Sequence, residues 1–293
     1  MSDNEIPTRP LVVVGVDGSE DGLRAVLFGV RSALRRDGEL LLVNAVDDAV
    51  LAGSWGVVYD PGVLQRAGEA ATESAKEFAI STGLPADRVR TDVLLGNPSA
   101  VLIRLSEVAD LVVVGRRSAS GLERMFVGST SVAVAGAAAC PVVVISAAST
   151  PKPTGDNGMV GVGLDTSGSS LSVVETGFKQ ARLRQARLRL IHILQPPMGL
   201  FSQKLTPAQL DQQLVYVRGG IEAMANQLHD TYPEVEFEVS VSAGSPVNDL
   251  VNHSEHLDLL VLGVGAPGLP GFALGGLTRG LMAHAKCPLM LTR

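Results

Sequence analysis

The sequence matches itself at a constant offset of 148 residues. Asp17, within VVVGVDGS, returns as Asp165, within MVGVGLDTS. The run DLVVVG, which ends at Gly115, returns at the same offset as DLLVLG, which ends at Gly263. Repetition over so much of a chain indicates two copies of one structural unit.

The offset falls to 147 near the end of each copy, where Cys140 and Cys287 each precede a proline. We therefore expect one residue to be missing between Gly276 and Cys287. The period is much longer than the roughly 20 to 50 residues of solenoid repeats. Each copy should therefore bury a hydrophobic core of its own.

Length and composition agree with this division. A chain of 293 residues is expected to form about two domains. We predict a first domain at 9–147, a linker at 148–158 and a second domain at 159–293, because the linker is rich in Pro, Gly and Ser and has no apolar periodicity. A high apolar content with only 4% aromatic residues is typical of sheets buried on both faces.

Short apolar runs alternate with segments of helical periodicity in each copy. In the first copy, 11–16 is expected to be a buried strand, and Ser19 is the expected N-cap of the helix that follows. Further strands are expected at 40–46, 89–95, 110–115 and 142–145, and further helices at 63–82, 99–108 and 129–139. This alternation predicts an α/β fold in which each copy forms a five-stranded parallel sheet.

Ligands of such sheets bind beyond the carboxyl ends of the strands. Asp17 follows the first strand, and a long loop that begins at Gly115 follows the fourth. The loop ends in GSTS at the start of a helix, whose free N–H groups favour an anion. It carries the arginines Arg116, Arg117 and Arg124. The loop suits a polyphosphate; an ordinary Gly/Ser turn with solvated arginines is the alternative.

Four segments of the first copy resemble the universal stress protein family: VGVDGS on the first strand, DLVVVG on the fourth, GSTS after the loop and CPVVVI on the fifth. The resemblance covers nearly the whole chain in both copies, and it is to tandem members of the actinobacterial type. It implies a Rossmann-like fold related to the adenine nucleotide α-hydrolases. It also implies a stress-response role with ATP and Mg²⁺ as the ligand.

Nucleotide-binding members of this family carry Gly, two residues, Gly, nine residues, Gly and then Ser or Thr. The first copy keeps this spacing, with Ser118 in place of the second glycine, which is harmless only if its φ is negative. By the resemblance, Asp17 and the backbone near Ala45 would contact ribose and adenine. The residues expected at the phosphates are Gly115, Ser118, Gly128, Ser129, Thr130 and Ser131.

The second copy departs further from the family pattern. Its loop runs from Gly263 through Ala266 to Leu277, so that the second glycine and the hydroxyl are both replaced. Between Asp258 and Arg279 the sequence has no charged residue. We therefore expect a degenerate second site and one ATP per chain, bound by the first copy.

Three other motifs have simpler interpretations. The segment 263–268 spells GxGxxG after a strand, but prolines interrupt the region and no acidic residue follows about 20 residues later, as a dinucleotide site requires. The run 121–130 lacks the lysine of a P-loop. His253 and His256 lie on a predicted helix without a visible third ligand, so we expect no metal site.

No residue is an evident general base beside the phosphates, so we assign no catalytic residue and expect at most slow ATP hydrolysis. Asn44 and His192, at equivalent strand ends, are expected to shape the sites. A scaffold that has lost nucleotide binding and acts by protein contact is the alternative function, and co-purifying adenine nucleotide would argue against it. An adenine nucleotide α-hydrolase enzyme is a third candidate, but its SGGxDS or HxGH signature is missing.

Charge and N-terminal sequence indicate the cellular compartment. The net charge of −6 argues against binding to nucleic acid or acidic lipid. The polar first ten residues do not resemble a signal peptide, and the apolar run 132–148 contains a proline, so we expect a cytoplasmic protein without membrane spans. The two cysteines are expected to be buried and unpaired in a reducing compartment.

The fifth strands, 142–145 and 289–291, would expose sheet edges if they were left uncovered. In the family resembled, such edges meet. The resemblance therefore implies that the two domains pair pseudo-symmetrically, that whole chains can form homodimers and that a protein partner, as yet unidentified, exists. Solution scattering should then show one compact particle. Two separated, independently tumbling domains would contradict this prediction.

Overall fold

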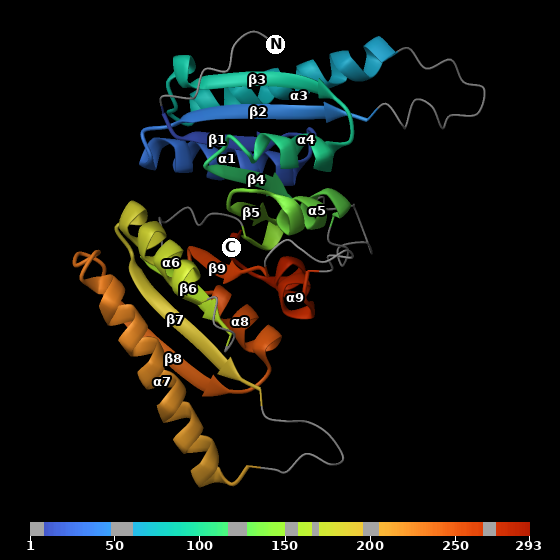
Figure 1. Ribbon diagram of the computed structural model, residues 1–293. Helices are drawn as coiled ribbons and strands as arrows, with labels where there is room; N and C mark the ends of the chain where they lie inside the picture. The colour runs from blue at the N-terminus through green and yellow to red at the C-terminus, as the bar shows by residue number, and fades with distance from the viewer. Residues whose placement is uncertain are drawn as a thin grey trace, which may run out of the picture. The chain divides into compact units, whose positions relative to one another are not determined.

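The computed structural model describes residues 9–47, 61–116, 128–149, 158–165, 170–195, 205–265 and 274–293. The chain divides into two compact units, and within the described residues each contains a five-stranded sheet with helices packed against it (Figure 1). The predicted fold class, two tandem copies of a Rossmann-like α/β domain, is confirmed.

The first unit follows the predicted order of strands and helices. Its strands are β1 (Leu11–Gly15), β2 (Glu39–Val46), β3 (Val89–Leu95), β4 (Leu111–Gly115) and β5 (Val142–Ile145). Its helices are α1 (Glu20–Arg35), α3 (Pro61–Ser81), α4 (Pro98–Leu105) and α5 (Ser129–Ala137), with 3-10 turns η1 (Ala86–Arg88) and η3 (Ala147–Ser149). The strands pair in parallel in the order β3-β2-β1-β4-β5.

The centre of this sheet is apolar and tightly packed. β1 lies between β2 and β4, and Val12, Val13 and Val14 are fully buried. α1 packs against β1 and β4, and α3 packs against β2 and β3. The approach of α1 requires Gly29, because a Cβ at that position would lie 2.5 Å from Cγ2 of Val14. The alternation of buried strand and amphipathic helix therefore builds a core mainly of aliphatic side chains, with Phe28 of α1 as a buried aromatic residue.

The second unit repeats the first. Its strands are β6 (Met159–Leu164), β7 (Arg187–Leu194), β8 (Phe237–Ala243), β9 (Leu259–Gly263) and β10 (Leu289–Thr292). Its helices are α6 (Ser170–Arg184), α7 (Pro207–His229), α8 (Pro246–Ser254) and α9 (Gly276–His284). The strands again pair in parallel, in the order β8-β7-β6-β9-β10.

Individual polar contacts are repeated as well as the topology. The Leu11 N–H donates to Asp110 Oδ2 at 2.8 Å, and the Met159 N–H donates to Asp258 Oδ2 at 3.0 Å. In each copy, the aspartate before the fourth strand therefore caps the start of the first strand. Gly177 of α6 repeats the role of the α1 glycine, since a Cβ there would overlap a β6 side chain.

The position of the missing residue differs from the prediction. α5 and α9 each contain nine residues, and they follow the caps Gly128 and Gly275. The caps are 147 residues apart, so the residue is missing between Gly263 and Gly275. The prediction that placed it between Gly276 and Cys287 is wrong. Ser129, Thr130 and Ser131 therefore correspond to Gly276, Leu277 and Thr278.

Other expectations concern the apolar run, the cysteines and the linker. The run 132–148 is divided between the end of α5, β5 and η3, and no helix in the described part of the chain is long and apolar enough to cross a membrane. Neither of these described cysteines, Cys140 and Cys287, forms a disulfide, and Cys287 is buried whereas Cys140 is half-buried. The predicted linker begins inside η3, and its residues 150–157 lie outside the described residues.

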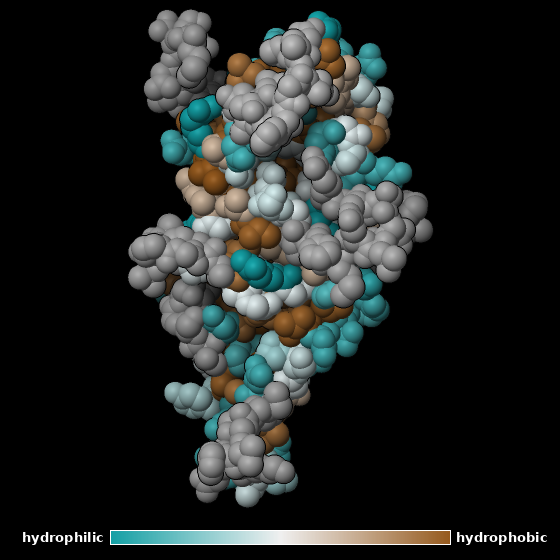
Figure 2. Space-filling model, turned by 90° about the vertical axis from the view of Figure 1, so that its right-hand side faces the viewer, coloured by the Kyte–Doolittle hydropathy of each residue, from teal (hydrophilic) through white to brown (hydrophobic). Residues whose placement is uncertain are grey.

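Large exposed hydrophobic side chains are distributed over several elements. Figure 2 shows hydrophobic residues interspersed with hydrophilic ones on the face that it draws. The exposed residues are Leu23, Leu34, Val63, Ile80, Leu95, Val108, Leu171, Val215 and Tyr216. Scattered exposure of this kind is normal on protein surfaces and does not by itself require a partner.

Candidate functional site

A cavity of 480 Å³ lies at the carboxyl edge of the first sheet. Its walls come from the ends of β1, β2 and β4 and from the starts of α4 and α5. Predicted site residues on its lining are Asp17, Ala45, Gly115, Gly128, Ser129, Thr130 and Ser131. The remaining predicted residue, Ser118, lies outside the described residues. The structure thus brings together predicted residues from the ends of β1, β2 and β4 and from the start of α5.

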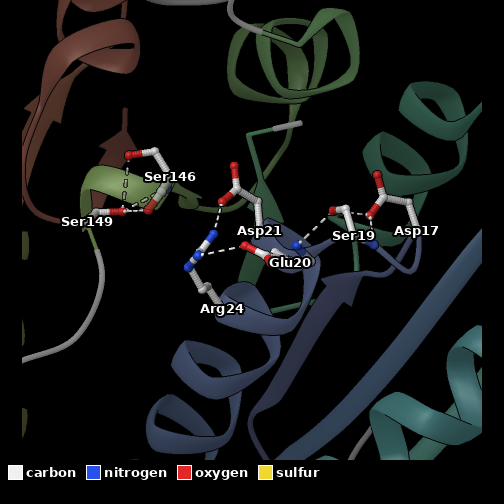
Figure 3. Close-up of polar contacts among 8 residues, drawn as sticks. Asp17, Ser19, Glu20, Asp21, Arg24, Ser146 and Ser149 are labelled. Carbon is white, nitrogen blue, oxygen red and sulfur yellow. Dashed lines mark hydrogen bonds and ion pairs between the residues drawn. The ribbon is translucent and has the colours of Figure 1, made fainter. Parts of the chain in front are cut away.

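Asp17 is oriented by the turn between β1 and α1. The backbone N–H and the hydroxyl of Ser19 both donate to Asp17 Oδ1, at 3.0 and 2.6 Å (Figure 3). Ser19 is also the predicted N-cap, since its Oγ accepts from the Gly22 N–H at 3.1 Å. Gly18 has a φ of +76°, a conformation that favours glycine. The sequence DGS therefore fixes the Asp17 carboxylate at the edge of the cavity.

Gly115 allows the start of α1 to lie directly against the end of β4. A Cβ on Gly115 would lie 2.7 Å from the backbone carbonyl atoms of Asp21 and 2.9 Å from the Gly22 nitrogen. Backbone atoms held in a helix cannot yield as the end of a side chain can. Ser131 Oγ donates to the Gly115 carbonyl at 3.2 Å, which ties the first turn of α5 to β4.

The start of α5 points free backbone donors toward the cavity. Gly128 is its N-cap, with φ −56° and ψ 137°, and as a glycine it has no side chain to accept from the first turn. The first N–H groups of a helix have no intrahelical acceptor, and together with the helix dipole they attract an anion. Because its φ is negative, position 128 does not require glycine for its backbone conformation. Its missing side chain leaves the approach to those N–H groups open.

Sequence reasoning missed the wall that α4 contributes. Asn97 lines the cavity and caps α4, because its Oδ1 accepts from the Ser99 N–H at 3.1 Å. Its Nδ2 lies 3.4 Å from Oδ2 of Asp47, which also lines the cavity. The available signal was an Asn-Pro pair directly after a predicted strand, a typical helix start. Asn44 has the predicted shaping role, since its Nδ2 donates to the Val16 carbonyl at 2.7 Å.

A buried carboxylate, also missed, lies behind the Asp17 turn. Asp21 is fully buried, and Arg24 donates to its Oδ1 at 2.6 Å (Figure 3). Its Oδ2 has no hydrogen-bond partner within the described part of the chain. Burial raises the pKa of Asp21, and the positive charges of Arg24 and Arg116 oppose that rise. The ionised form is therefore held at a cost in desolvation.

The prediction that arginines of the loop would face the phosphates needs a correction. Arg116 is buried at the end of β4 and is not among the described residues that line the cavity. Its charge acts on Asp21 instead. Arg117 and Arg124 lie outside the described residues. The described lining therefore offers helix N–H groups and hydroxyls to an anion, beside the carboxylates of Asp17 and Asp47.

The second unit has a smaller cavity, of 330 Å³, at the equivalent edge. Asp165 lines it at the position of Asp17, and Gln195 lines it at the position of Asp47. Leu277 and Thr278 line it from α9. Its described lining includes no lysine or arginine.

Two other candidate sites, the GxGxxG segment and the pair of histidines on α8 and just after it, gain no support from the structure. α9 begins at Gly276, far beyond the end of β9, whereas the dinucleotide fingerprint opens a helix directly after the strand. His253 lies in the last turn of α8, and burial lowers its pKa. Among the described residues, no group of three or more His, Cys, Asp or Glu could hold a metal ion.

The family model of the universal stress proteins matches the chain twice, at 10–146 and 158–293. The chain belongs to the universal stress protein family. Universal stress proteins of Mycobacterium tuberculosis are similar over its whole length. One is 28% identical over 302 residues, covering 96% of each chain, and another is 25% identical over 298 residues, covering 100% of each. The duplication is therefore shared with relatives of about the same length.

The fold is also shared with a solved universal stress protein from Archaeoglobus fulgidus. That structure has a TM-score of 0.68 and 16% sequence identity, and the match covers 97% of this chain and 96% of the other. At this level of identity the similarity establishes the architecture. The assignment to the tandem universal stress proteins, predicted from four short segments, is confirmed by the two family matches.

Proposed function

We propose that this tandem universal stress protein binds ATP in its first unit and acts in the cytoplasm as a nucleotide-dependent regulator of the stress response. The observation that carries the proposal is the meeting of Asp17, Ala45, Gly115 and the Gly128 helix cap on one cavity of 480 Å³. Sites for small molecules typically measure about 300 to 1,000 Å³.

Each part of the cavity has a role in this proposal. The Asp17 carboxylate, oriented by Ser19, accepts hydrogen bonds from the ribose hydroxyls, and adenine lies beside the backbone at Ala45. The first turn of α5 holds the phosphates through its N–H groups and the hydroxyls of Ser129 and Thr130. Mg²⁺ on the phosphates would offset their charge, because it prefers phosphate and carboxylate oxygens.

The chemistry at α5 favours binding over turnover. Serine and threonine hydroxyls and backbone N–H groups stabilise negative charge, but none of them is a general base at neutral pH. Bound ATP would therefore persist long enough for its presence to be read by a partner.

A scaffold without nucleotide is the second candidate. It is favoured by the two carboxylates, Asp17 and Asp47, on a described lining that includes no arginine. An anion must overcome their repulsion, which helix N–H groups offset by about 0.3 to 2 kcal/mol. The two candidates differ in whether the chain binds ATP at all.

Asp17→Ala should weaken ATP binding about 10- to 100-fold, because hydrogen bonds to a charged group contribute roughly 1.5 to 3 kcal/mol. Isothermal titration calorimetry with ATP and magnesium measures the change. Asp165→Ala, the equivalent substitution in the second unit, is the matched control and should leave ATP affinity unchanged. Equal affinities for the wild type and Asp17→Ala would contradict the proposed ribose contact.

A further inference from the structure

Asp21 is a buried acid that has no role in the proposed nucleotide site. It lies in the first turn of α1, and its side chain has no exposed surface. Ionised carboxylates are rarely buried in this way, because burial removes their hydration. A buried acid costs stability, and acids of this kind concentrate at functional sites.

Only part of the Asp21 carboxylate is satisfied. Arg24 donates to Oδ1 at 2.6 Å, and the same guanidinium also pairs with the exposed Glu20 at 3.1 Å. Oδ2 is buried, and it has no hydrogen-bond partner in the described part of the chain. An oxygen without a donor costs more on a charged group than on a neutral one. Uptake of a proton from solvent at Oδ2 therefore relieves the least satisfied atom of the group.

The charges that act on Asp21 come from three places. Burial is the main cause of its raised pKa; Arg24 on α1 and Arg116 at the end of β4 lower the pKa, and Asp17 raises it. Where α1 packs on β1, β4 and β5, the strands contribute only apolar residues and glycine. No charged residue of β2 or α3, which also pack on α1, is among the described groups that act on Asp21. The side chains of η3, which lies against α1, are uncharged.

This carboxyl group lies directly behind the cavity of the first unit. Gly115 lines the cavity, and a Cβ on Gly115 would lie 2.7 Å from the backbone carbonyl atoms of Asp21. Asp17, which lines the cavity from the turn before α1, is close enough to act on the Asp21 charge (Figure 3). Asp21 itself is not part of the described lining. It can therefore influence a bound anion through its charge without touching it.

We propose that Asp21 makes anion binding in the first cavity dependent on pH, because its carboxylate takes up a proton when an anion binds. The inference rests on the proposed function, which places phosphate groups at the start of α5. A bound phosphate disfavours a second negative charge buried close by, so a proton passes from solvent to Asp21 Oδ2 and leaves a neutral carboxyl group. By reciprocity, protonation of Asp21 before binding strengthens anion binding by the same factor. The first site would then bind ATP more tightly as the pH falls.

Asp21→Asn fixes the neutral state with little change of shape. At neutral pH, the full-length variant should bind ATP with magnesium about 3- to 10-fold more tightly than the wild type in isothermal titration calorimetry, because one buried negative charge near the anion is gone. As the pH is lowered to about 5, the ratio of the two dissociation constants should fall toward one, because the wild type gains the proton. Other groups, ATP included, take up protons with both chains, so their contribution cancels in the ratio. A ratio that is one at neutral pH, or that does not change with pH, would overturn the inference.

Asp87→Asn controls for the loss of one negative charge. Asp87 is exposed on η1, before the amino end of β3. The seven residues of β3 place it about 20 Å from the carboxyl edge of the sheet, beyond the Debye length of about 8 Å at physiological salt. Its substitution should change ATP affinity less than about twofold. An increase equal to that of Asp21→Asn would mean that net charge, and not the buried carboxyl group, sets the affinity, and would overturn the inference.

A second measurement needs no ligand. Because the pKa of Asp21 is higher in the folded chain than in the unfolded chain, its ionisation costs native stability. That cost is absent below the unfolded pKa of about 3.9, and it appears as the pH rises through the folded pKa. The melting temperature of Asp21→Asn should therefore rise relative to that of the wild type between about pH 4 and about pH 7. A difference in melting temperature that is the same at every pH would overturn the inference at its first step.

Proton uptake separates this inference from the proposed function. Calorimetry of ATP binding at about pH 5, in two buffers of different ionisation enthalpy, should show more protons taken up by the wild type than by Asp21→Asn. ATP binding with equal proton uptake by both chains would overturn the inference and leave the proposed function standing. Absence of ATP binding by either chain at either pH would overturn the proposed function, and the coupling with it.

Discussion

ATP with magnesium, at about 100 times its Kd, should raise the melting temperature of the wild-type chain by several degrees, because a ligand at that concentration stabilises the native state by about 2.7 kcal/mol. Gly128→Glu should abolish the shift. The substitution places a carboxylate beside the α5 N–H groups that we propose for phosphate, so that two negative groups compete for the same donors. Differential scanning fluorimetry measures both results.

The chain supplies a matched control for this experiment. Gly275 is the equivalent cap of α9, and an added Cβ there has nothing within 4 Å. Gly275→Glu should therefore fold normally and retain the full shift. A wild type without a shift at millimolar ATP, or a shift that survives Gly128→Glu, would favour the scaffold function instead.

The full-length chain should bind one ATP, not two. The first unit presents Ser129 and Thr130 at the phosphate end of its cavity, whereas the second presents Gly276 and Leu277 in a smaller cavity. Calorimetric titration should give one site per chain for the wild type and for Gly275→Glu. No high-affinity ATP site should remain in Gly128→Glu.

Two equivalent ATP sites would contradict this prediction, but they would also be informative. They would mean that the backbone shape of the segment before the helix matters more than hydroxyls and arginines.

The regular part of the fold could be predicted because its signals are local. Strand limits at 89–95 and 142–145 agree with the structure, since each run begins and ends with a change in polarity or a turn residue. The helix expected at 99–108 is displaced toward its Asn97 cap and ends at Leu105. Beyond that end, Ser106 Oγ donates to the Ile103 carbonyl and accepts from the distant Ala139 N–H. That last contact cannot be read from the sequence around it.

The parts that escaped prediction depend on geometry that residue types do not encode. Adjacent Gly275 and Gly276 can each be aligned with Gly128, and only the helix caps show which of them corresponds. An acidic residue in the first turn of a helix usually faces solvent and favours the dipole. Asp21 instead lies under the end of β4, because Gly115 lets the two segments approach so closely.

The order of the strands has a consequence for synthesis. β1 lies at the centre of its sheet, yet its β4 partner and the Asp110 cap of Leu11 lie 99 residues further along the chain. β4 ends at Gly115, well after β2 ends at Val46. At about 5 to 20 residues per second, one edge of β1 therefore stays unpaired for roughly 3 to 14 s after its other neighbour, β2, has been synthesised. A translational pause between β3 and β4 would prolong that exposure and invite pairing between nascent chains. The second unit repeats the delay, because the Asp258 cap of Met159 is also 99 residues away.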